Sequence, residues 1–328
     1  MLEHLTIADF RYLNAQTSES YVQLYCKPRG LEPKTLKLDT KDGQAVAHWI
    51  GDPDADVVII YCHGGGYTQP ANRGNFRHLA GIVKDLNSDG SSPSISVLML
   101  AYTLVPEAVY PAQLREAAVV LAHLVHDTGR SPSRVFLAGD SAGGNLALSL
   151  LSHILHPHPD VFAVKLERPL GGAVLLSPWV GFRTDYPSFS TNATLDMVAP
   201  LALRKWSAMF LNKANFPDPE ADPGLILGDA WTEACRNPSS WWNGMHQVVS
   251  DVFIWWGGYE VFVDPLRELE KNLKAGWADG GGDPSRTKFL ESAKEAHVAP
   301  IVDTMIPGVK KGDAQVAIEE WFKGRLQQ

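Results

Sequence analysis

Residues 134–155 form the passage that most restricts how this chain can fold. The run begins with the apolar stretch VFLAG, continues through the small residues DSAGG, and ends in the Ala/Leu-rich stretch NLALSLLSHIL. A continuous apolar run is typical of a strand buried on both faces, and the Ala/Leu-rich stretch is typical of a helix. A buried strand that turns directly into a helix predicts an α/β fold with a parallel sheet.

Strands and helices alternate along most of the remaining chain. Buried strands are predicted at 56–66, 94–104, 171–180 and 251–258, a last strand at 287–292, and helices at 111–129, 266–276 and 314–326. A first pair of strands, 36–40 and 45–51, flanks the turn signal KDGQ. This alternation predicts a mostly parallel central sheet with helices on both faces. A single α/β domain over residues 1–328 is within the usual size of such folds.

Two stretches break the alternation. Residues 1 to about 33 have an amphipathic helical pattern, and residues 181–248 hold many prolines and aromatic residues with little strand pattern. Seven of the ten tryptophans fall between Trp179 and Trp256. Ligands of open α/β sheets bind at the carboxyl ends of the strands. We therefore expect the two stretches to form a helical cap over that end of the sheet.

The charge and composition exclude several classes of function. The chain carries a formal net charge of −8, so it lacks the basic surface that binds a phosphate backbone or an anionic membrane. Its three cysteines are too few and too scattered for a disulfide framework or a zinc site, which favours a reducing compartment. The first residues do not resemble a signal peptide, and no stretch reaches the ~20 apolar residues of a membrane span. We expect a cytoplasmic protein with no nucleic-acid partner and no stable membrane insertion.

Residues 139–143 read GDSAG, which fits the pattern G-x-S-x-G between a strand and a helix. In this context the turn is so sharp that only small residues fit beside the serine, and it exposes the hydroxyl of Ser141 near the helix N-terminus. The run HGGG at 63–66 ends an earlier buried strand. Two of its glycine N–H groups, with the N–H of Ala142, can stabilise an oxyanion. We therefore expect Ser141 to attack a carbonyl carbon, and His63 to brace the glycine loop.

A serine nucleophile needs an acid and a base, which follow it in the order Ser, acid, His in chains with this turn. His297, in the segment EAHVAP, is the histidine that follows both of the last two predicted strands. The acid should lie on the loop after the strand 251–258, where Glu260 and Asp264 both stand. Glu260 is closer to the strand end, whereas Asp264 precedes a proline and a helix and suits a helix N-cap. These positions favour Glu260, with Asp264 as the alternative.

Four segments resemble the hormone-sensitive-lipase-like branch of the α/β hydrolases, of the fold-3 type, and particularly its fungal esterases and acetyl hydrolases. They are HGGGY (63–67), AYTLVPEAVYPAQLREA (101–117), GDSAGGNLALSL (139–150) and LSPWV (176–180). The resemblance implies an α/β-hydrolase fold with a helical cap and without a metal or cofactor. It also implies Ser141 as the nucleophile, His297 as the base, and Gly65, Gly66 and Ala142 as the donors of the oxyanion hole.

The acid departs from the pattern of that branch, in which it is usually the first Asp of a D-P-L-x-D run. Here the similar sequence DPLRE lies at 264–268, about one helical turn later in the chain than that run. Glu260 therefore takes the first acidic position after the strand and Asp264 the second. The resemblance also allows a homodimer, since relatives often pair through an edge strand.

Together these residues predict a serine esterase that cleaves a small or medium carboxylic ester through an acyl-enzyme. An acetyl ester, another short acyl ester and a lactone all fit, including one of a specialised metabolite. Two other interpretations stay open: a lyase or cyclase that uses the same pocket without hydrolysis, and a catalytically silent ligand-binding protein. Aromatic residues of the insertion could line the pocket, although packing inside the cap is the commoner use. These residues are Trp206, Phe210, Phe216, Trp231, Trp241 and Trp242.

Overall fold

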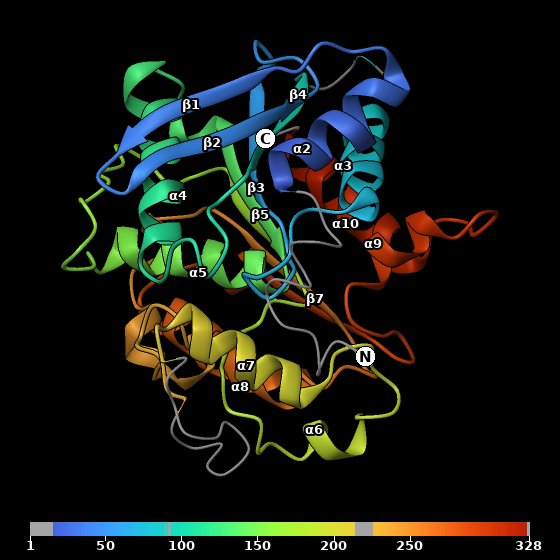
Figure 1. Ribbon diagram of the computed structural model, residues 1–328. Helices are drawn as coiled ribbons and strands as arrows, with labels where there is room; N and C mark the ends of the chain where they lie inside the picture. Colours follow the sequence, from blue (N-terminus) through green and yellow to red (C-terminus); the bar gives the residue numbers. More distant parts are fainter. Residues whose placement is uncertain (1–15, 89, 91–92, 214–225, 327–328) are drawn as a thin grey trace.

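The computed structural model describes residues 16–88, 90, 93–213 and 226–326. Eight strands form its central sheet: β1 (Thr35–Thr40), β2 (Gly43–Ile50), β3 (Val57–Cys62), β4 (Ile95–Leu100), β5 (Val135–Asp140), β6 (Gly172–Leu176), β7 (Val252–Gly257) and β8 (Thr287–Ser292). Their order across the sheet is β1-β2-β4-β3-β5-β6-β7-β8 (Figure 1). β2 pairs antiparallel with both β1 and β4, and all other neighbours are parallel. The predicted, mostly parallel sheet is confirmed.

Each central strand sends alternate side chains into two separate cores. In β3, Val58, Ile60 and Cys62 belong to the first core, whereas Val57 and Ile59 belong to the second. Every residue of β3, β4, β5 and β7 is buried. Burial on both faces explains why these segments are unbroken apolar runs in the sequence.

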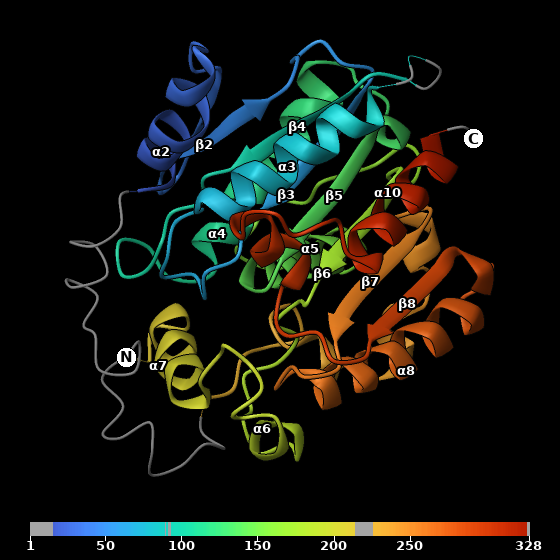
Figure 2. The same ribbon diagram turned by 90° about the vertical axis from the view of Figure 1, so that its right-hand side faces the viewer.

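Helices cover both faces of the sheet, as predicted (Figure 1 and Figure 2). The first core lies under α4 (Ala112–Ala122), α5 (Ala142–Leu155) and α8 (Val263–Asp279). The second core lies under α3 (Arg73–Leu86) and α10 (Asp313–Leu326). Among the helices of the described ranges, none combines the length and the apolar character that crossing a membrane requires.

Helix α3 is missing from the sequence-based prediction. Its sequence starts with RGN and so lacks apolar residues in its first turn. A capping box fixes this end: the side chain of Asn72 accepts the N–H of Gly74 at 2.7 Å, and that of Asn75 accepts the N–H of Asn72 at 3.0 Å. Phe76 and Leu79 then pack into the second core.

The N-terminal segment is helical where it is described. Its short helical turns are Thr17–Ser20 (α2), Tyr21–Cys26 and Lys27–Arg29. They end at Gly30, whose φ of +63° is the left-handed conformation in which helices commonly stop. The helical pattern predicted for residues 1–33 is confirmed for this part, and residues 1–15 lie outside the described residues.

The insertion predicted at 181–248 divides into two parts. The first part holds α6 (Ser188–Thr191), which lies beyond the carboxyl ends of β7 and β8 (Figure 2), and α7 (Pro200–Phe210), whose Trp206 packs against Gly66 in the loop after β3. Residues 214–225 lie outside the described chain. The second part, 226–248, packs beside α5 and α8 instead.

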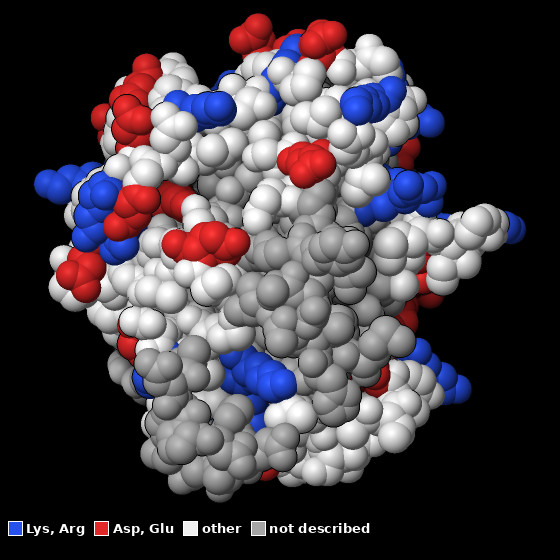
Figure 3. All heavy atoms as spheres, in the orientation of Figure 1, with Lys and Arg blue, Asp and Glu red and all other residues white. Residues whose placement is uncertain are grey.

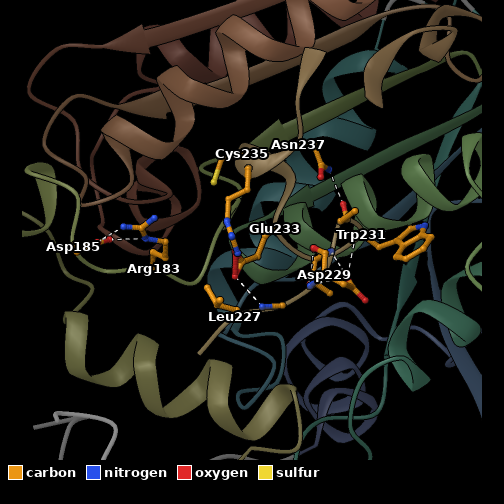
Figure 4. Close-up of polar contacts among 12 residues, drawn as sticks. Arg183, Asp185, Leu227, Asp229, Trp231, Glu233, Cys235 and Asn237 are labelled. Carbon is orange, nitrogen blue, oxygen red and sulfur yellow. Dashed lines mark hydrogen bonds and ion pairs between the residues drawn. The ribbon is translucent and has the colours of Figure 1, made fainter. Parts of the chain in front are cut away.

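Polar contacts fix the second part of the insertion (Figure 4). The carboxylate of Asp229 accepts the N–H groups of Trp231 and Thr232 at 3.1 and 3.0 Å. The side-chain amide of Asn145, in α5, donates to the carbonyl oxygen of Thr232 at 2.7 Å. The insertion thus places α6 and α7 beyond the sheet, while residues 226–248 pack along the side of the sheet that α5 covers.

Candidate active site

Ser141 occupies the sharp turn between β5 and α5, with φ +52° and ψ −119°. Non-glycine residues rarely adopt a positive φ, so surrounding contacts must hold this conformation. A methyl group at Gly139 or Gly143 would overlap with backbone atoms, and at Gly143 these include the carbonyl oxygen of Cys62. The N–H of Ser141 donates to the carbonyl oxygen of Leu176 at 3.0 Å. Close packing therefore requires glycines at both positions, and it places the serine at the carboxyl end of β5.

The imidazole of His297 contacts the carboxylate of Glu260, with 2.9 Å between Nδ1 and Oε2. The second oxygen of Glu260 accepts the hydroxyl of Ser177 at 2.5 Å and the N–H of Gly257 at 2.6 Å. Glu260 is fully buried, and His297 is 5% exposed. A carboxylate held in this way keeps the proton of the imidazole on Nδ1, so Nε2 can accept another.

Asp264, the alternative acid, lies in the first turn of α8 and makes a different contact. Its Oδ2 accepts the N–H of Ser188 at 2.8 Å, which joins α8 to α6. The expectation that Asp264 caps the helix is wrong, because α8 starts one residue earlier and its N-cap is Phe262. Of the two acids that the sequence left open, Glu260 is the one that meets the imidazole.

Opposing effects act on the pKa of His297. Burial alone would lower it, because a buried imidazolium loses its hydration. The hydrogen bond with Glu260 and the charge of that residue act in the other direction, and the charges of Asp196 and Asp140 add to them. As a result, the pKa of His297 lies above its ordinary value of 6.5.

Asp196, between α6 and α7, contacts the loops of both the base and the acid. Its Oδ1 accepts the N–H of His297 at 3.3 Å, and its Oδ2 accepts the N–H of Val261 at 2.8 Å. Ser177 makes a second link, since its hydroxyl oxygen accepts the N–H of Val298 at 3.1 Å. Sequence reasoning missed both residues. Ser177 belongs to LSPWV, one of the four segments that resemble the hormone-sensitive-lipase-like branch, so the sequence offered a signal for it. Asp196 lies outside these four segments.

The glycine loop after β3 is held by the buried carboxylate of Asp140. Its Oδ1 accepts the N–H of Gly64 at 2.9 Å, the hydroxyl of Tyr61 at 2.6 Å and the side-chain amide of Asn75 at 3.2 Å. Burial raises the pKa of Asp140 to about 6. Because all three partners donate, the loop is held best when this carboxylate is ionised.

The positions expected to form the oxyanion hole lie next to Ser141. Gly65 and Gly66 adopt φ values of +114° and +59°, and a methyl group on Gly66 would overlap with the indole of Trp206. Ala142 is the first residue of α5, so its N–H has no acceptor within the helix. A loop of this kind can turn backbone N–H groups toward a substrate oxygen.

His63 braces the glycine loop, in agreement with the role expected for it. Its Nδ1 donates to the carbonyl oxygen of Gly64 at 2.7 Å, and its Nε2 accepts the hydroxyl of Thr17 at 3.0 Å. The ring also stacks on Tyr102, with 4.4 Å between centroids. Burial lowers the pKa of His63 to about 4, so the ring is neutral. With both nitrogens engaged, His63 is not placed to take a proton from Ser141.

A cavity of about 180 Å³ lies beside the proposed nucleophile and base. Ser141 and His297 line it together with the glycine loop and with apolar side chains of α7 and α9 (Ala299–Val302). Asp140 also lines this cavity. Within the described part of the chain, no group of three His, Cys, Asp or Glu side chains is arranged to hold a metal ion.

The aromatic residues of the insertion divide between the cavity and the protein interior. Trp206 lines the cavity. Phe210 stacks on Tyr67, with 3.8 Å between ring centroids. Trp231, Trp241 and Trp242 pack beside α5 and α8. Phe216 lies outside the described residues. Of the two uses considered for these aromatic residues, lining the pocket applies to Trp206, and packing, the commoner use, applies to the others that are described.

Comparison with known sequences relates the chain to other hydrolases. A sequence profile of the α/β hydrolase fold matches residues 59–280, which is more than half of the chain. An acetyl-hydrolase of Streptomyces hygroscopicus is 29% identical over 237 residues, which cover 71% of this chain and 68% of that protein. Hormone-sensitive lipase of Bos taurus is 30% identical over 124 residues, which cover 36% of this chain but 14% of the lipase.

Comparison with solved structures supports the same fold. The structure of an esterase from the bacterial hormone-sensitive lipase family superposes with a TM-score of 0.68, over 98% of this chain and 93% of the esterase, at 24% identity. The chain therefore belongs to the α/β hydrolase fold family, in the group related to hormone-sensitive lipase.

Proposed function

We propose that this chain is a carboxylic ester hydrolase that works through a covalent acyl-enzyme on Ser141. The observation that carries the proposal is the buried pair of His297 and Glu260, because the imidazole of this pair lines the same cavity as Ser141. A serine nucleophile needs such a base, oriented by a carboxylate, to lose its proton during attack. Similarity to proteins named acetyl-hydrolase and esterase supports an ester as the substrate.

In the first half of the proposed reaction, Nε2 of His297 accepts the hydroxyl proton of Ser141 as Oγ bonds to the carbonyl carbon. The carbonyl oxygen takes up the negative charge and accepts N–H groups of Gly65, Gly66 and Ala142. The bond between the carbonyl carbon and the alcohol oxygen then breaks. His297 gives its proton to that oxygen, and the alcohol leaves.

In the second half, water takes the place of the alcohol. His297 accepts a proton from the water as its oxygen bonds to the acyl carbon. The bond to Oγ of Ser141 then breaks, the serine recovers its proton from His297, and the carboxylic acid leaves. Glu260 remains ionised and stabilises the imidazolium in both halves.

We also propose that the acyl group is short. The indole of Trp206 lies directly against Gly66 of the glycine loop, which limits the space next to the oxyanion donors. The cavity of about 180 Å³ is smaller than the roughly 300–1,000 Å³ of pockets for drug-sized ligands. An acetyl ester or another short acyl ester is the best fit, and a lactone of a specialised metabolite belongs to the same chemical class.

Active-site labelling combined with ester turnover tests the proposal. The purified chain is treated with a fluorophosphonate probe, the labelled residue is located by mass spectrometry, and p-nitrophenyl esters from acetate to octanoate are assayed. We expect Ser141 to be labelled and the acetate to be turned over fastest. Ser141→Ala should abolish both signals. The matched control Ser88→Ala, at an exposed serine, should change neither.

The other outcomes assign the chain to a different class. Labelling of Ser141 without turnover of any ester would favour a lyase or cyclase that uses the same pocket. An unlabelled, correctly folded protein would favour a ligand-binding protein. Either result contradicts the esterase proposal.

A further inference from the structure

Most of the exposed apolar side chains lie on two short segments, and each segment contributes one methionine to the lining of the cavity. In the described part of the chain, eight large apolar side chains are exposed, and five of these lie on two short segments, 195–197 and 305–309. The five are Leu195, Met197, Met305, Ile306 and Val309. Met197 is 59% exposed and Met305 39%, yet both also line the cavity that contains Ser141 and His297. An apolar patch that continues into a catalytic cavity marks a binding surface.

The second of these segments follows directly from the base. After His297 the chain forms α9 and reaches Met305 within eight residues, and Val298, Ile301, Val302 and Met305 all line the cavity. The segment between α9 and α10 projects at the right of Figure 1. Figure 3 shows it as mostly uncharged surface with basic side chains at its tip. The cavity wall that begins at His297, the proposed general base, is therefore apolar and open toward solvent.

In the proposed reaction, the two walls of the cavity contact different parts of the ester. His297 must protonate the leaving alcohol, so the alcohol lies on the side of His297 and α9. The acyl group then points toward the other wall, which α7 forms with Leu203 and Trp206. That wall is closed, because the indole of Trp206 lies against Gly66. The closed wall suits a short acyl group, and the open apolar wall suits a larger group.

From this asymmetry we infer that the exposed apolar rim formed by Met197 and Met305 binds the alcohol part of the ester. The preferred substrate is then a short acyl ester of a large apolar alcohol. Methionine side chains are flexible and adapt to irregular apolar ligands, which suits a rim that two of them line. The inference rests on the proposed ester hydrolysis and adds which side of the ester carries the apolar bulk.

Isomeric esters separate the two sides of the cavity. Octyl acetate and ethyl octanoate have the same composition, but the long chain lies in the alcohol of the first and in the acyl group of the second. Ethyl acetate serves as the small reference. Each ester is assayed by acid release below its solubility limit, with Ser141→Ala as the blank. We expect kcat/KM for octyl acetate to exceed that for both other esters by about tenfold or more, the size of effect that apolar pockets supply.

Variants of the rim locate the effect. Met197→Ser and Met305→Ser should each lower the ratio of kcat/KM for octyl acetate to that for ethyl acetate by several fold. Val316→Ser, at an apolar residue of α10 that is 41% exposed, is the matched control and should leave the ratio unchanged. Circular dichroism and the melting temperature check that each variant is folded.

Several results would overturn the inference without touching the proposed function. Ethyl octanoate could be cleaved as well as or better than octyl acetate, or the ratio could stay unchanged in both methionine variants. A rate that rises only above the solubility limit would show that the rim binds a lipid surface and not a single alcohol chain. Failure of the proposed function looks different, since none of the three acyl esters would then be cleaved above the Ser141→Ala blank.

Discussion

Nδ1 of His297 lies 2.9 Å from Oε2 of Glu260, and the two residues follow neighbouring parallel strands. Glu260 stands three residues after the end of β7, and His297 stands five residues after the end of β8. Ser141 directly follows β5. Parallel strands end at the same edge of a sheet, so three distant segments of the chain bring these groups together: Ser141 and His297 line one cavity, and Glu260 lies behind the imidazole.

Glu260→Gln tests which carboxylate orients the base. Glutamine preserves the size of the side chain but removes the charge that stabilises the imidazolium. We expect kcat/KM on p-nitrophenyl acetate to fall by about 10⁴-fold, the loss seen when a triad carboxylate is neutralised. Asp264→Asn is the matched control at the alternative acid and should change kcat/KM by less than about threefold. An equal loss in both variants would contradict the assignment of Glu260.

The pH dependence of kcat/KM tests the state of His297. The free enzyme needs a neutral imidazole, so kcat/KM should rise with pH through an apparent pKa above 6.5. In Glu260→Gln, burial is no longer opposed by the charge of the carboxylate, and the rise should move to lower pH. The contribution of His297 to stability has the opposite pH dependence. Because its pKa is raised in the folded state, it stabilises the folded protein below pH 6.5, and this stabilisation is lost as the pH rises through the folded-state pKa. A rise at or below pH 6.5 in the unmodified enzyme would contradict the prediction.

Asp196→Asn tests whether the carboxylate between α6 and α7 positions the base. The asparagine side chain can accept only one of the N–H groups of His297 and Val261, and it lacks the charge that helps to raise the pKa of His297. We expect about a tenfold loss in kcat/KM, equivalent to one hydrogen bond. We also expect the rise of kcat/KM to shift to lower pH. The control is Asp185→Asn, since Asp185 lies in the same insertion and pairs with Arg183 at the surface. A lower melting temperature with an unchanged pH profile would reduce Asp196 to a structural role.

The sequence was sufficient to predict the parts of the site that depend on local patterns. The turn around Ser141 has a sequence signature because overlap with the backbone forbids any side chain at Gly143. The order of the predicted strands along the chain also identified His297, because this histidine follows the last two of them. The choice between Glu260 and Asp264 stayed open, because both follow β7 within seven residues and the register of a loop depends on its tertiary contacts. Here the hydroxyl of Ser177 and the N–H of Gly257 hold Glu260 toward the imidazole.

Features that depend on contacts between distant segments could not be predicted. The bond from Asp196 to the backbone of His297 joins residues 101 positions apart, and it has no local pattern. The division of the insertion has the same origin. Prolines and aromatic residues are spread along the whole of 181–248, so the sequence does not separate its parts. In the structure, Asn145 of α5 binds residue 232 of the second part, whereas α6 and α7 lie beyond the sheet. Helix α3 was missed because its start depends on the side chains of Asn72 and Asn75 and not on an apolar pattern.

Buried histidines predict that the protein loses stability in mild acid. Burial lowers the pKa of both His63 and His78 from 6.5 to about 4. A lowered pKa in the folded state means that the neutral form is favoured there, so the stabilisation is complete above pH 6.5 and is lost as the pH falls toward 4. Each residue should remove about 2 kcal/mol from the free energy of unfolding by about pH 4.5.

Urea unfolding of His78→Leu measures the contribution of one such group. Leucine cannot take up a proton, so the loss of unfolding free energy between pH 7 and about pH 4.5 should be smaller than in the unmodified protein by about 2 kcal/mol. His126→Leu, at an exposed histidine, is the matched control and should keep the full pH dependence. The comparison uses differences between two pH values, so a constant loss from repacking around residue 78 cancels. If His78→Leu and the unmodified protein lose the same free energy over this range, the buried ring is not the group that titrates.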